Sequence, residues 1–220
     1  MMITTRWTLL AAASIALSAC RSAPASGAAA LTPAQMSMRD GGIPPYTAGD
    51  VTFMQGMIGH HAQAVRMSAF AEPNTSSSDV RVLAGRIAVS QTDEIAFMQN
   101  WLRDRRQSVP DTSAGHAHHD GMSMPGMTMA GGEGAAMMPG MLTTAQMDTL
   151  ARATGLAFDF YFLTYMIQHH RGAIDMVDEL MAIRGAANDD NVFKFVSDVV
   201  ADQSTEIARM QLMLKTRPRP

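Results

Sequence analysis

The sequence has one cysteine, no surplus of positive charge and few aromatic residues. Cys20 is the only thiol, so the chain cannot form an internal disulfide. Lysine and arginine number 17 against 20 aspartate and glutamate, a balance that does not favour nucleic acid as a partner. The chain also lacks a phosphate loop, a dinucleotide-binding fingerprint and a Ser–His–Asp arrangement. These absences argue against several common enzyme classes, and we predict no catalytic residues.

Methionine is the abundant residue. The 220 residues include 21 Met but only eight Phe, three Tyr and two Trp. The hydrophobic fraction of 47% is ample for the core of one compact domain or two small ones. The chain is therefore rich in thioethers and almost free of thiols.

The N-terminal segment has the features of an export signal. An apolar stretch over residues 8–19 follows one early positive charge and is too short to span a bilayer comfortably. It ends Leu17-Ser18-Ala19-Cys20, which resembles a bacterial lipoprotein signal, although an ordinary secretory peptide containing a cysteine is the alternative. We predict a signal peptide over 1–19, a lipid anchor on Cys20 that holds the protein at the membrane of the periplasm or cell envelope, and a flexible tether over 20–45.

The rest of the chain contains one unit twice. Residues 50–67 align without gaps on residues 159–176, with eight of eighteen positions identical. A second pair, 91–102 and 203–214, follows at nearly the same offset. The chain therefore consists of a duplicated unit.

Apolar residues within each unit recur every three or four positions, which predicts α-helices. We expect helices over residues 48–71, 79–105, 157–184 and 189–215, with a short extra helix over 144–154. These helices form two hairpins, residues 46–106 and 143–220. The apolar stripe of each hairpin is too narrow to make it stable alone. We predict that they dock as an all-α four-helix bundle.

Two segments have the spacing of a capping box with aspartate in place of glutamate. These are Thr47 to Asp50 and Ser76 to Asp79. They predict the starts of the first two helices, and residues 73–75 should separate those helices.

Polar side chains interrupt the apolar stripes at one height of the predicted bundle. His60 falls opposite Gln91 and Met57 opposite Glu94 of the paired helix. In the second unit His169 falls opposite Gln203 and Met166 opposite Glu206. Hydrogen bonds to those partners could simply fix the register of the bundle. The second imidazoles, His61 and His170, are not explained in that way, and we favour metal binding by the two pairs.

Imidazole and thioether together suit copper, particularly Cu(I). Methionines at helical spacing are more often core residues, so those one turn from the histidines, Met57 and Met166, are the strongest candidates. The full set of candidate ligands in the helices is Met57, His60, His61, Met67, Glu94, Met98, Met166, His169, His170, Met176, Glu206 and Met210.

A segment over residues 107–142 links the two hairpins. It contains seven Gly, seven Met, three His and no aromatic residue, so we expect no core there. Glycine suits a flexible spacer, but exposed methionines are open to oxidation, and capture of a soft metal explains them better. The imidazoles favour Cu(II) or Zn(II). The candidate ligands here are His116, His118, His119, Met122, Met124, Met127 and Met129.

With these residues in view, both units resemble the family called domain of unknown function 305. The resemblance covers about residues 46–105 and 143–215 and rests on a double-histidine motif followed by a helix with Gln-x-x-Glu-Ile-x-x-Met. The matching positions are Asp50, Phe53, Met57, Ile58, His60, His61, Ala64, Gln91, Glu94, Ile95 and Met98, and Asp159, Phe162, Met166, Ile167, His169, His170, Ala173, Gln203, Glu206, Ile207 and Met210. The resemblance implies a ferritin-like bundle, exported in bacteria, similar to periplasmic copper-binding proteins involved in copper tolerance.

The sequence thus predicts an exported, lipid-anchored protein that sequesters copper or hands it to an acceptor protein, with zinc as a second candidate metal. We expect it not to be an enzyme. A ferritin-like di-metal oxidase is the first alternative, but that chemistry normally uses four carboxylates and two Glu-x-x-His pairs, and neither Glu94 nor Glu206 has histidine three residues later. A metal-free structural protein of the envelope is the second alternative.

Overall fold

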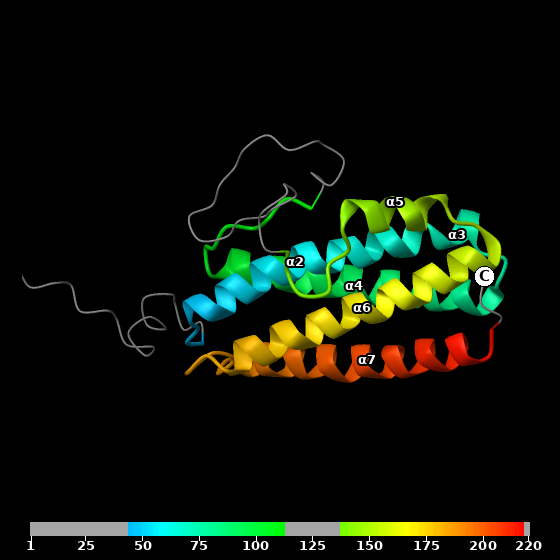
Figure 1. The fold of residues 1–220 in the computed structure, drawn as a ribbon. Coiled ribbons are helices and arrows are strands. Elements are labelled where there is room, and N and C mark those ends of the chain that lie inside the picture. Colours follow the sequence, from blue (N-terminus) through cyan, green and yellow to red (C-terminus); the bar gives the residue numbers. More distant parts are fainter. Residues whose placement is uncertain (1–43, 113–136, 218–220) are drawn as a thin grey trace, which may run out of the picture. The chain divides into compact units, whose positions relative to one another are not determined.

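The structure is a computed structural model that describes residues 44–112 and 137–217. These residues form helices and contain no β-strand, which confirms the predicted all-α class (Figure 1). The helices are α2 (Ala48–Ala69), α3 (Ala71–Asn74), α4 (Ser78–Asp104), α5 (Thr144–Arg152), α6 (Gly155–Met181) and α7 (Asp190–Lys215).

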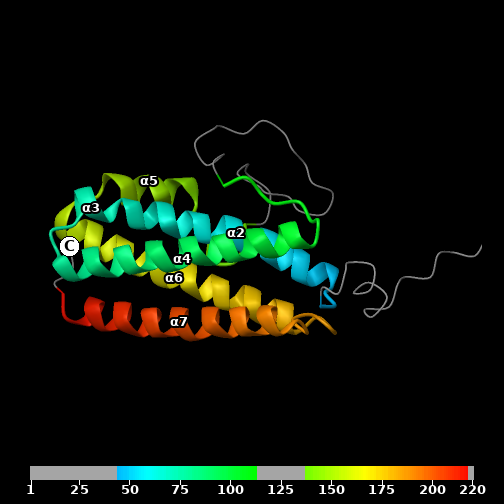
Figure 2. The same cartoon turned by 180° about the vertical axis from the view of Figure 1, so that it is seen from behind.

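Two hairpins make up the bundle. Helix α2 packs along α4, and α6 packs along α7, while α2 and α6 meet at the centre and join the hairpins. Helix α5 lies across α2 and α6 on the outside of the bundle, as the views from the front and from behind both show (Figures 1 and 2). None of the helices in the described residues is both long and apolar enough to cross a membrane.

The helices begin and end within a few residues of their predicted limits. Helices α2 and α5 end two residues early, and α6 begins two residues and ends three residues before its predicted limits. The difference at α2 arises because residues 71–74 form the separate short helix α3, so Pro73 lies inside a helical turn and not in an open break.

The capping boxes account for the helix starts in one case of two. At Thr47 the hydroxyl accepts a hydrogen bond from the Asp50 N–H, while the Asp50 carboxylate accepts one from the Thr47 N–H at 2.7 Å. The second predicted box is wrong by one residue. Ser77, not Ser76, caps α4 and accepts a hydrogen bond from the Val80 N–H.

The apolar core has two clusters, which lie on either side of a buried polar layer along the bundle. One cluster includes Met67, Met166 and Met210. The other includes Met57, Met98 and Met176. Each cluster thus contains three of these six methionines as core residues, which is typical of this flexible side chain.

The first aspartate of each repeated unit joins its own hairpin to the other one. Asp50 is buried at the start of α2, and its second carboxylate oxygen accepts a hydrogen bond from the Ala187 N–H, 2.7 Å away in the connection between α6 and α7. Asp159 on α6 accepts a hydrogen bond from the Thr75 hydroxyl in the other hairpin. The same sequence position therefore makes contacts between the hairpins in both units.

A buried ion pair lies at the end of the bundle where α2 begins. The Arg105 guanidinium meets the Asp189 carboxylate, which caps α7, and lies 4.1 Å from the centre of the Trp101 ring. Burial lowers the pKa of Arg105, although the nearby Asp189 acts in the opposite direction.

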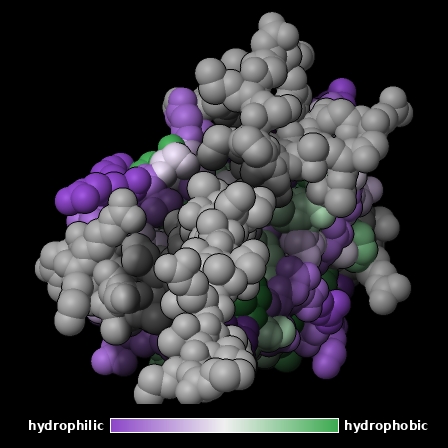
Figure 3. Space-filling view, turned by 90° about the vertical axis from the view of Figure 1, so that its left-hand side faces the viewer, coloured by the Kyte–Doolittle hydropathy of each residue, from purple (hydrophilic) through white to green (hydrophobic). Residues whose placement is uncertain are grey.

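Figure 3 shows the end of the bundle at which α2 begins and α6 joins α7. Apolar and polar surface alternate there, and no large uniform patch is visible between the grey atoms. Met181, Ile183 and Phe193 are among the exposed apolar side chains of this region.

Several predictions fall outside the described residues. The signal peptide and Cys20 lie there, as does all but the end of the tether. So do the candidate ligands in the linker, His116, His118, His119, Met122, Met124, Met127 and Met129.

Replacing Asp50 by alanine should destabilise the protein by about 2–4 kcal/mol, because the helix loses its cap and the Ala187 N–H loses its buried acceptor. Equilibrium unfolding in urea measures this change. Asp79→Ala is the matched control, since Asp79 is an exposed aspartate in the first turn of α4 and should cost less than about 1 kcal/mol. Equal losses in the two variants would contradict the role assigned to Asp50.

Candidate metal centre

Four histidines lie in one layer at the centre of the bundle. His60 and His61 come from α2 and His169 and His170 from α6, and all four are fully buried. The rings of His60 and His169 meet across the contact between the two hairpins, with their centres 3.8 Å apart and their planes tilted by 39°. The two sequence motifs are therefore brought together at one place, as predicted.

The other two histidines each face a glutamate within their own hairpin. His170 Nε2 lies 2.6 Å from the Glu206 carboxylate in a hydrogen bond, and His61 Nε2 lies 2.7 Å from the Glu94 carboxylate. The second contact is close but lacks the alignment of a hydrogen bond. The two glutamates are only partly exposed, so both contacts lie at the border of the core.

The end of the linker covers the central pair. We call residues 137–142 the strap. The Pro139 carbonyl lies 3.0 Å from His60 Nε2 and accepts its hydrogen bond. Leu142 is buried in the core, and the Gln63 side chain both donates to its carbonyl, at 3.0 Å, and accepts from its N–H, at 2.7 Å. The expectation that the linker contributes nothing to a core is therefore wrong at its last residues.

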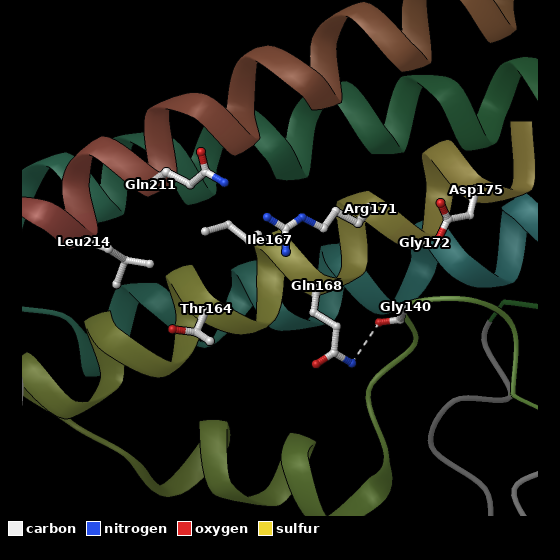
Figure 4. A pocket seen from close by; sticks show the side chains of 9 residues that line it. All are labelled: Gly140, Thr164, Ile167, Gln168, Arg171, Gly172, Asp175, Gln211 and Leu214. Carbon is white, nitrogen blue, oxygen red and sulfur yellow. Dashed lines mark hydrogen bonds between the residues drawn. The ribbon is translucent and has the colours of Figure 1, made fainter. Parts of the chain in front are cut away.

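The strap can lie this close only because α6 has a glycine beneath it. A Cβ atom on Gly172 would stand 2.0 Å from the Pro139 oxygen. Gly140 in the strap adopts a φ of +72°, a conformation that favours glycine. Its carbonyl accepts a hydrogen bond from the Gln168 amide, drawn as a dashed line in Figure 4.

A pocket of about 620 Å³ lies beside the strap, over α6 and α7 (Figure 4). Gly140 and Gly172 form its edge on the side of the strap. The remaining lining residues are Thr164, Ile167, Gln168, Arg171, Asp175, Gln211 and Leu214. The pocket does not contain the histidines, which lie deeper in the bundle.

Many nitrogen atoms in the histidine layer have no hydrogen-bond partner within the described residues. Both ring nitrogens of His61 and of His169 lack one, and so does Nδ1 of His60 and of His170. The buried amides of Gln91 and Gln203, which occupy aligned positions on α4 and α7, also lack partners. Because burial of an unpartnered polar group costs about 1–3 kcal/mol, this layer opposes folding unless something binds there.

The central imidazoles are neutral. Burial, reinforced by repulsion from His61, lowers the pKa of His60 from 6.5 to about 3. Burial and repulsion from His60 hold the pKa of His169 well below its ordinary value. A neutral imidazole has a free lone pair, which is the form that binds a metal.

A methionine lies one helical turn from each central histidine and offers a soft sulfur donor. Met57 lies one turn from His60 and Met166 one turn from His169, and both thioethers are fully buried. No three His, Cys, Asp or Glu side chains among the described residues converge as a metal site. Imidazole and thioether together are a donor combination that suits Cu(I).

The predicted pairing across each hairpin holds to within one helical turn. Glu94 meets His61 instead of Met57, and in the same way Glu206 meets His170 instead of Met166. The glutamates therefore contact histidines and do not point at a common centre. The alternative in which His60 and His169 bond to Gln or Glu is not found, since His60 bonds to Pro139.

Sequence reasoning missed the strap and its partners Gln63 and Gly172. These two residues occupy aligned positions in the two repeats. Gln63 binds the strap by hydrogen bonds, and Gly172 leaves room for the strap because it has no side chain. The signal was present as a glycine in the middle of a predicted helix.

Asp202 extends the acidic edge of the layer on α7. Partial burial raises its pKa, and the charges of Glu94 and Glu206 add to the effect. The glutamates of both hairpins therefore act on one carboxyl group.

Together, the fold and the site define a helical-bundle protein with a buried layer of histidines flanked by methionines. A family model described as domain of unknown function (DUF305) matches residues 50–214. The chain belongs to the DUF305 family. No curated protein matches it.

Solved structures share the fold. A DUF305 protein of Streptomyces coelicolor, named as a candidate secreted protein, is 29% identical, with 76% of this chain and 91% of that chain covered and a TM-score of 0.61. A DUF305 fragment from Deinococcus radiodurans is also 29% identical, with 79% and 100% covered and a TM-score of 0.62. CopM in its Cu(I)-bound form is 24% identical, with 76% and 95% covered and a TM-score of 0.54.

The neutral central histidines predict an acid-sensitive fold. The unfolded chain takes up protons on His60 and His169 near pH 6.5, whereas the folded chain resists protonation until the pH is far lower. The free energy of unfolding should therefore fall as the pH drops from about 7 towards 4, with a slope of up to ~2.7 kcal/mol per pH unit from these two groups. Urea unfolding across this range should give a flatter profile for His60→Leu/His169→Leu, and an unchanged slope would contradict the assignment.

Gly172→Ala should dislodge the strap, because the added Cβ would overlap the Pro139 carbonyl. We expect faster proteolysis within residues 137–143. The free energy of unfolding should fall by about 2–4 kcal/mol, because Leu142 becomes exposed and Gln63 loses its hydrogen bonds. Gly85→Ala on α4 is the control, since a Cβ there meets nothing within 4 Å and should stabilise the helix by up to about 1 kcal/mol. Equal protease resistance in both variants would show that the strap is not held as described.

Proposed function

We propose that this protein binds copper outside the cytoplasm and either sequesters it or hands it to an acceptor protein. The copper is cargo in this proposal, and the protein is not an enzyme. The buried histidine layer is the high-affinity site, with His60 and His169 at its centre. The histidines and methionines of residues 116–129 form a second, weaker site that captures the ion.

The observation that supports this proposal most is the set of unpartnered nitrogens in the core. His60 and His169 are fully buried, neutral and in ring contact, yet within the described part of the chain neither nitrogen of His169 makes an aligned hydrogen bond. A structural histidine in a core normally satisfies its ring nitrogens. A bound metal ion would give these lone pairs the partner that they lack.

The flanking methionines favour copper over harder ions. Met57 lies on one side of the layer and Met166 on the other, each in a different apolar cluster. Thioethers bind Cu(I) without losing a proton, and they do not form disulfides in an oxidising compartment. Ca²⁺ and Mg²⁺ would instead need several oxygen ligands.

One of the similar proteins has been solved with copper bound. CopM has been solved in a Cu(I)-bound and a Cu(II)-bound form, and the latter covers 77% of this chain with a TM-score of 0.55. The likeness to CopM at 24% identity shows the fold alone, so the case for copper depends on the donor set of this chain.

We further propose that the protein is exported and anchored by a lipid on Cys20. The order Leu17-Ser18-Ala19-Cys20 after an apolar run supports an anchor. The similar Streptomyces protein, named as a candidate secreted protein, supports export. A tether over residues 20–45 would then hold the bundle at the surface of the membrane.

Copper titration of three forms of the protein tests the proposal. We expect the wild type to show two classes of sites. His60→Leu/His169→Leu should lose the tight class, because the central lone pairs are gone. A linker variant with glutamine at His116, His118 and His119 and leucine at Met122, Met124, Met127 and Met129 should lose the weak class. The strap is left intact in this variant, since deletion of the whole linker would also remove the bonds to His60 and Gln63.

Thermal unfolding of each form is the control for folding. Equal copper uptake by all three forms would show that both proposed sites are wrong. Tight binding of two Fe²⁺ ions with consumption of O₂ would favour the di-metal oxidase instead. Loss of folding in the core variant, in a protein that never retains metal, would favour a purely structural role.

A further inference from the structure

Three of the four buried histidines present the same ring nitrogen to an oxygen atom. Nε2 of His60 faces the Pro139 carbonyl, Nε2 of His61 faces Glu94, and Nε2 of His170 faces Glu206. Three different elements supply these oxygens, namely the strap, α4 and α7. The shared feature is therefore independent of any one local structure.

The Pro139 contact determines where the proton of His60 resides. A carbonyl oxygen can only accept a hydrogen bond, so the bond of 3.0 Å requires a proton on Nε2. With the proton on Nε2, Nδ1 is the ring nitrogen whose lone pair can bind a metal. The Nδ1 atom is buried and has no partner among the described atoms.

Glu206 acts in the same way on His170, while Glu94 faces Nε2 of His61 without the alignment of a hydrogen bond. A carboxylate accepts hydrogen bonds and does not donate them, so Glu206 at 2.6 Å places the proton of His170 on Nε2. Glu94 lies at nearly the same distance from His61, at 2.7 Å. Nδ1 of both histidines is again buried and unpartnered.

We propose that Nδ1 is the metal-binding nitrogen of His60, His61 and His170, and that the Pro139 carbonyl, Glu94 and Glu206 are positioning groups that select it. This inference rests on the proposed function and says which atoms of the layer meet the copper. The glutamates are then not ligands. They hold the ring orientation and make Nδ1 a better donor, as carboxylates hydrogen-bonded to the opposite nitrogen of a metal-binding histidine do at other metal sites.

His169 differs from the other three histidines. Among the described residues neither of its nitrogens makes an aligned hydrogen bond, although the His60 backbone acts as an acceptor that raises its pKa, and its ring contacts that of His60. Its tautomer is therefore less restricted than those of the other, preset rings, so His169 can adapt to the ion.

The tautomers can be read directly by ¹⁵N NMR. In the protein labelled on histidine and carrying the linker variant above, only the four core histidines contribute. We expect His60, His61 and His170 to show a protonated Nε2 and an unprotonated Nδ1, and His169 to show a mixture. A protonated Nδ1 at His61 and His170 would overturn the inference before any metal is added.

Cu(I) is diamagnetic and allows the same spectra to be recorded after addition of the metal under reducing conditions. Shifts confined to Nδ1 at the preset histidines are the expected result. Large shifts at Nε2 with Nδ1 unchanged would place the metal on the other nitrogen and overturn the inference, while leaving copper binding itself intact. If the core takes up no Cu(I) at all, the proposed function fails instead, and the metal-free tautomers still report on the positioning groups.

Substitution of the glutamates separates positioning from simple stability. Glu94→Ala/Glu206→Ala should release His61 and His170 into tautomer mixtures, leave His60 unchanged, and weaken Cu(I) binding about 10–100-fold. Glutamine at both positions should restore the tautomers, since its carbonyl still accepts a hydrogen bond. Asp93→Ala, an exposed carboxylate next to Glu94 in sequence, is the control and should change neither readout. Unchanged tautomers and affinity in a folded alanine variant would overturn the inference.

Discussion

The burial of four imidazoles between two apolar clusters is the constraint on which the rest of the structure depends. The layer divides the core, with Met57, Met98 and Met176 on one side and Met67, Met166 and Met210 on the other. Burial of polar groups without partners costs free energy, and the protein offsets only part of that cost, through Pro139 and the two glutamates. The unpaired remainder is an unfavourable arrangement in the absence of a ligand, as is common at binding sites.

The strap connects the linker to this layer. Its carbonyl reaches His60, and its last residue is part of the core, so the linker and the central histidines belong to one structure. Methionines of the linker therefore lie along the same chain as the group that covers the site. In the proposed function, copper captured by the linker passes to the buried imidazoles.

Sequence periodicity was enough to predict the helices, the docking of two hairpins and the meeting of the two histidine pairs, because amphipathic stripes and capping residues act locally. It could not predict the strap, since the approach of Pro139 to Gly172 joins residues far apart in the sequence through backbone contact. It also placed Glu94 and Glu206 one turn from their true partners. The register between the two helices of a hairpin depends on how their connection packs. In the first hairpin the short helix α3 follows α2 directly.

The central claim is that the core histidines, and not only the linker, bind a soft metal ion. Diffraction at the copper absorption edge from crystals grown with one equivalent of Cu(I) tests it most directly. The account predicts an anomalous peak between α2 and α6, within bonding distance of an imidazole nitrogen of His60 or His169. A peak found only on linker residues, with the two central rings still in contact and unpartnered, would contradict it.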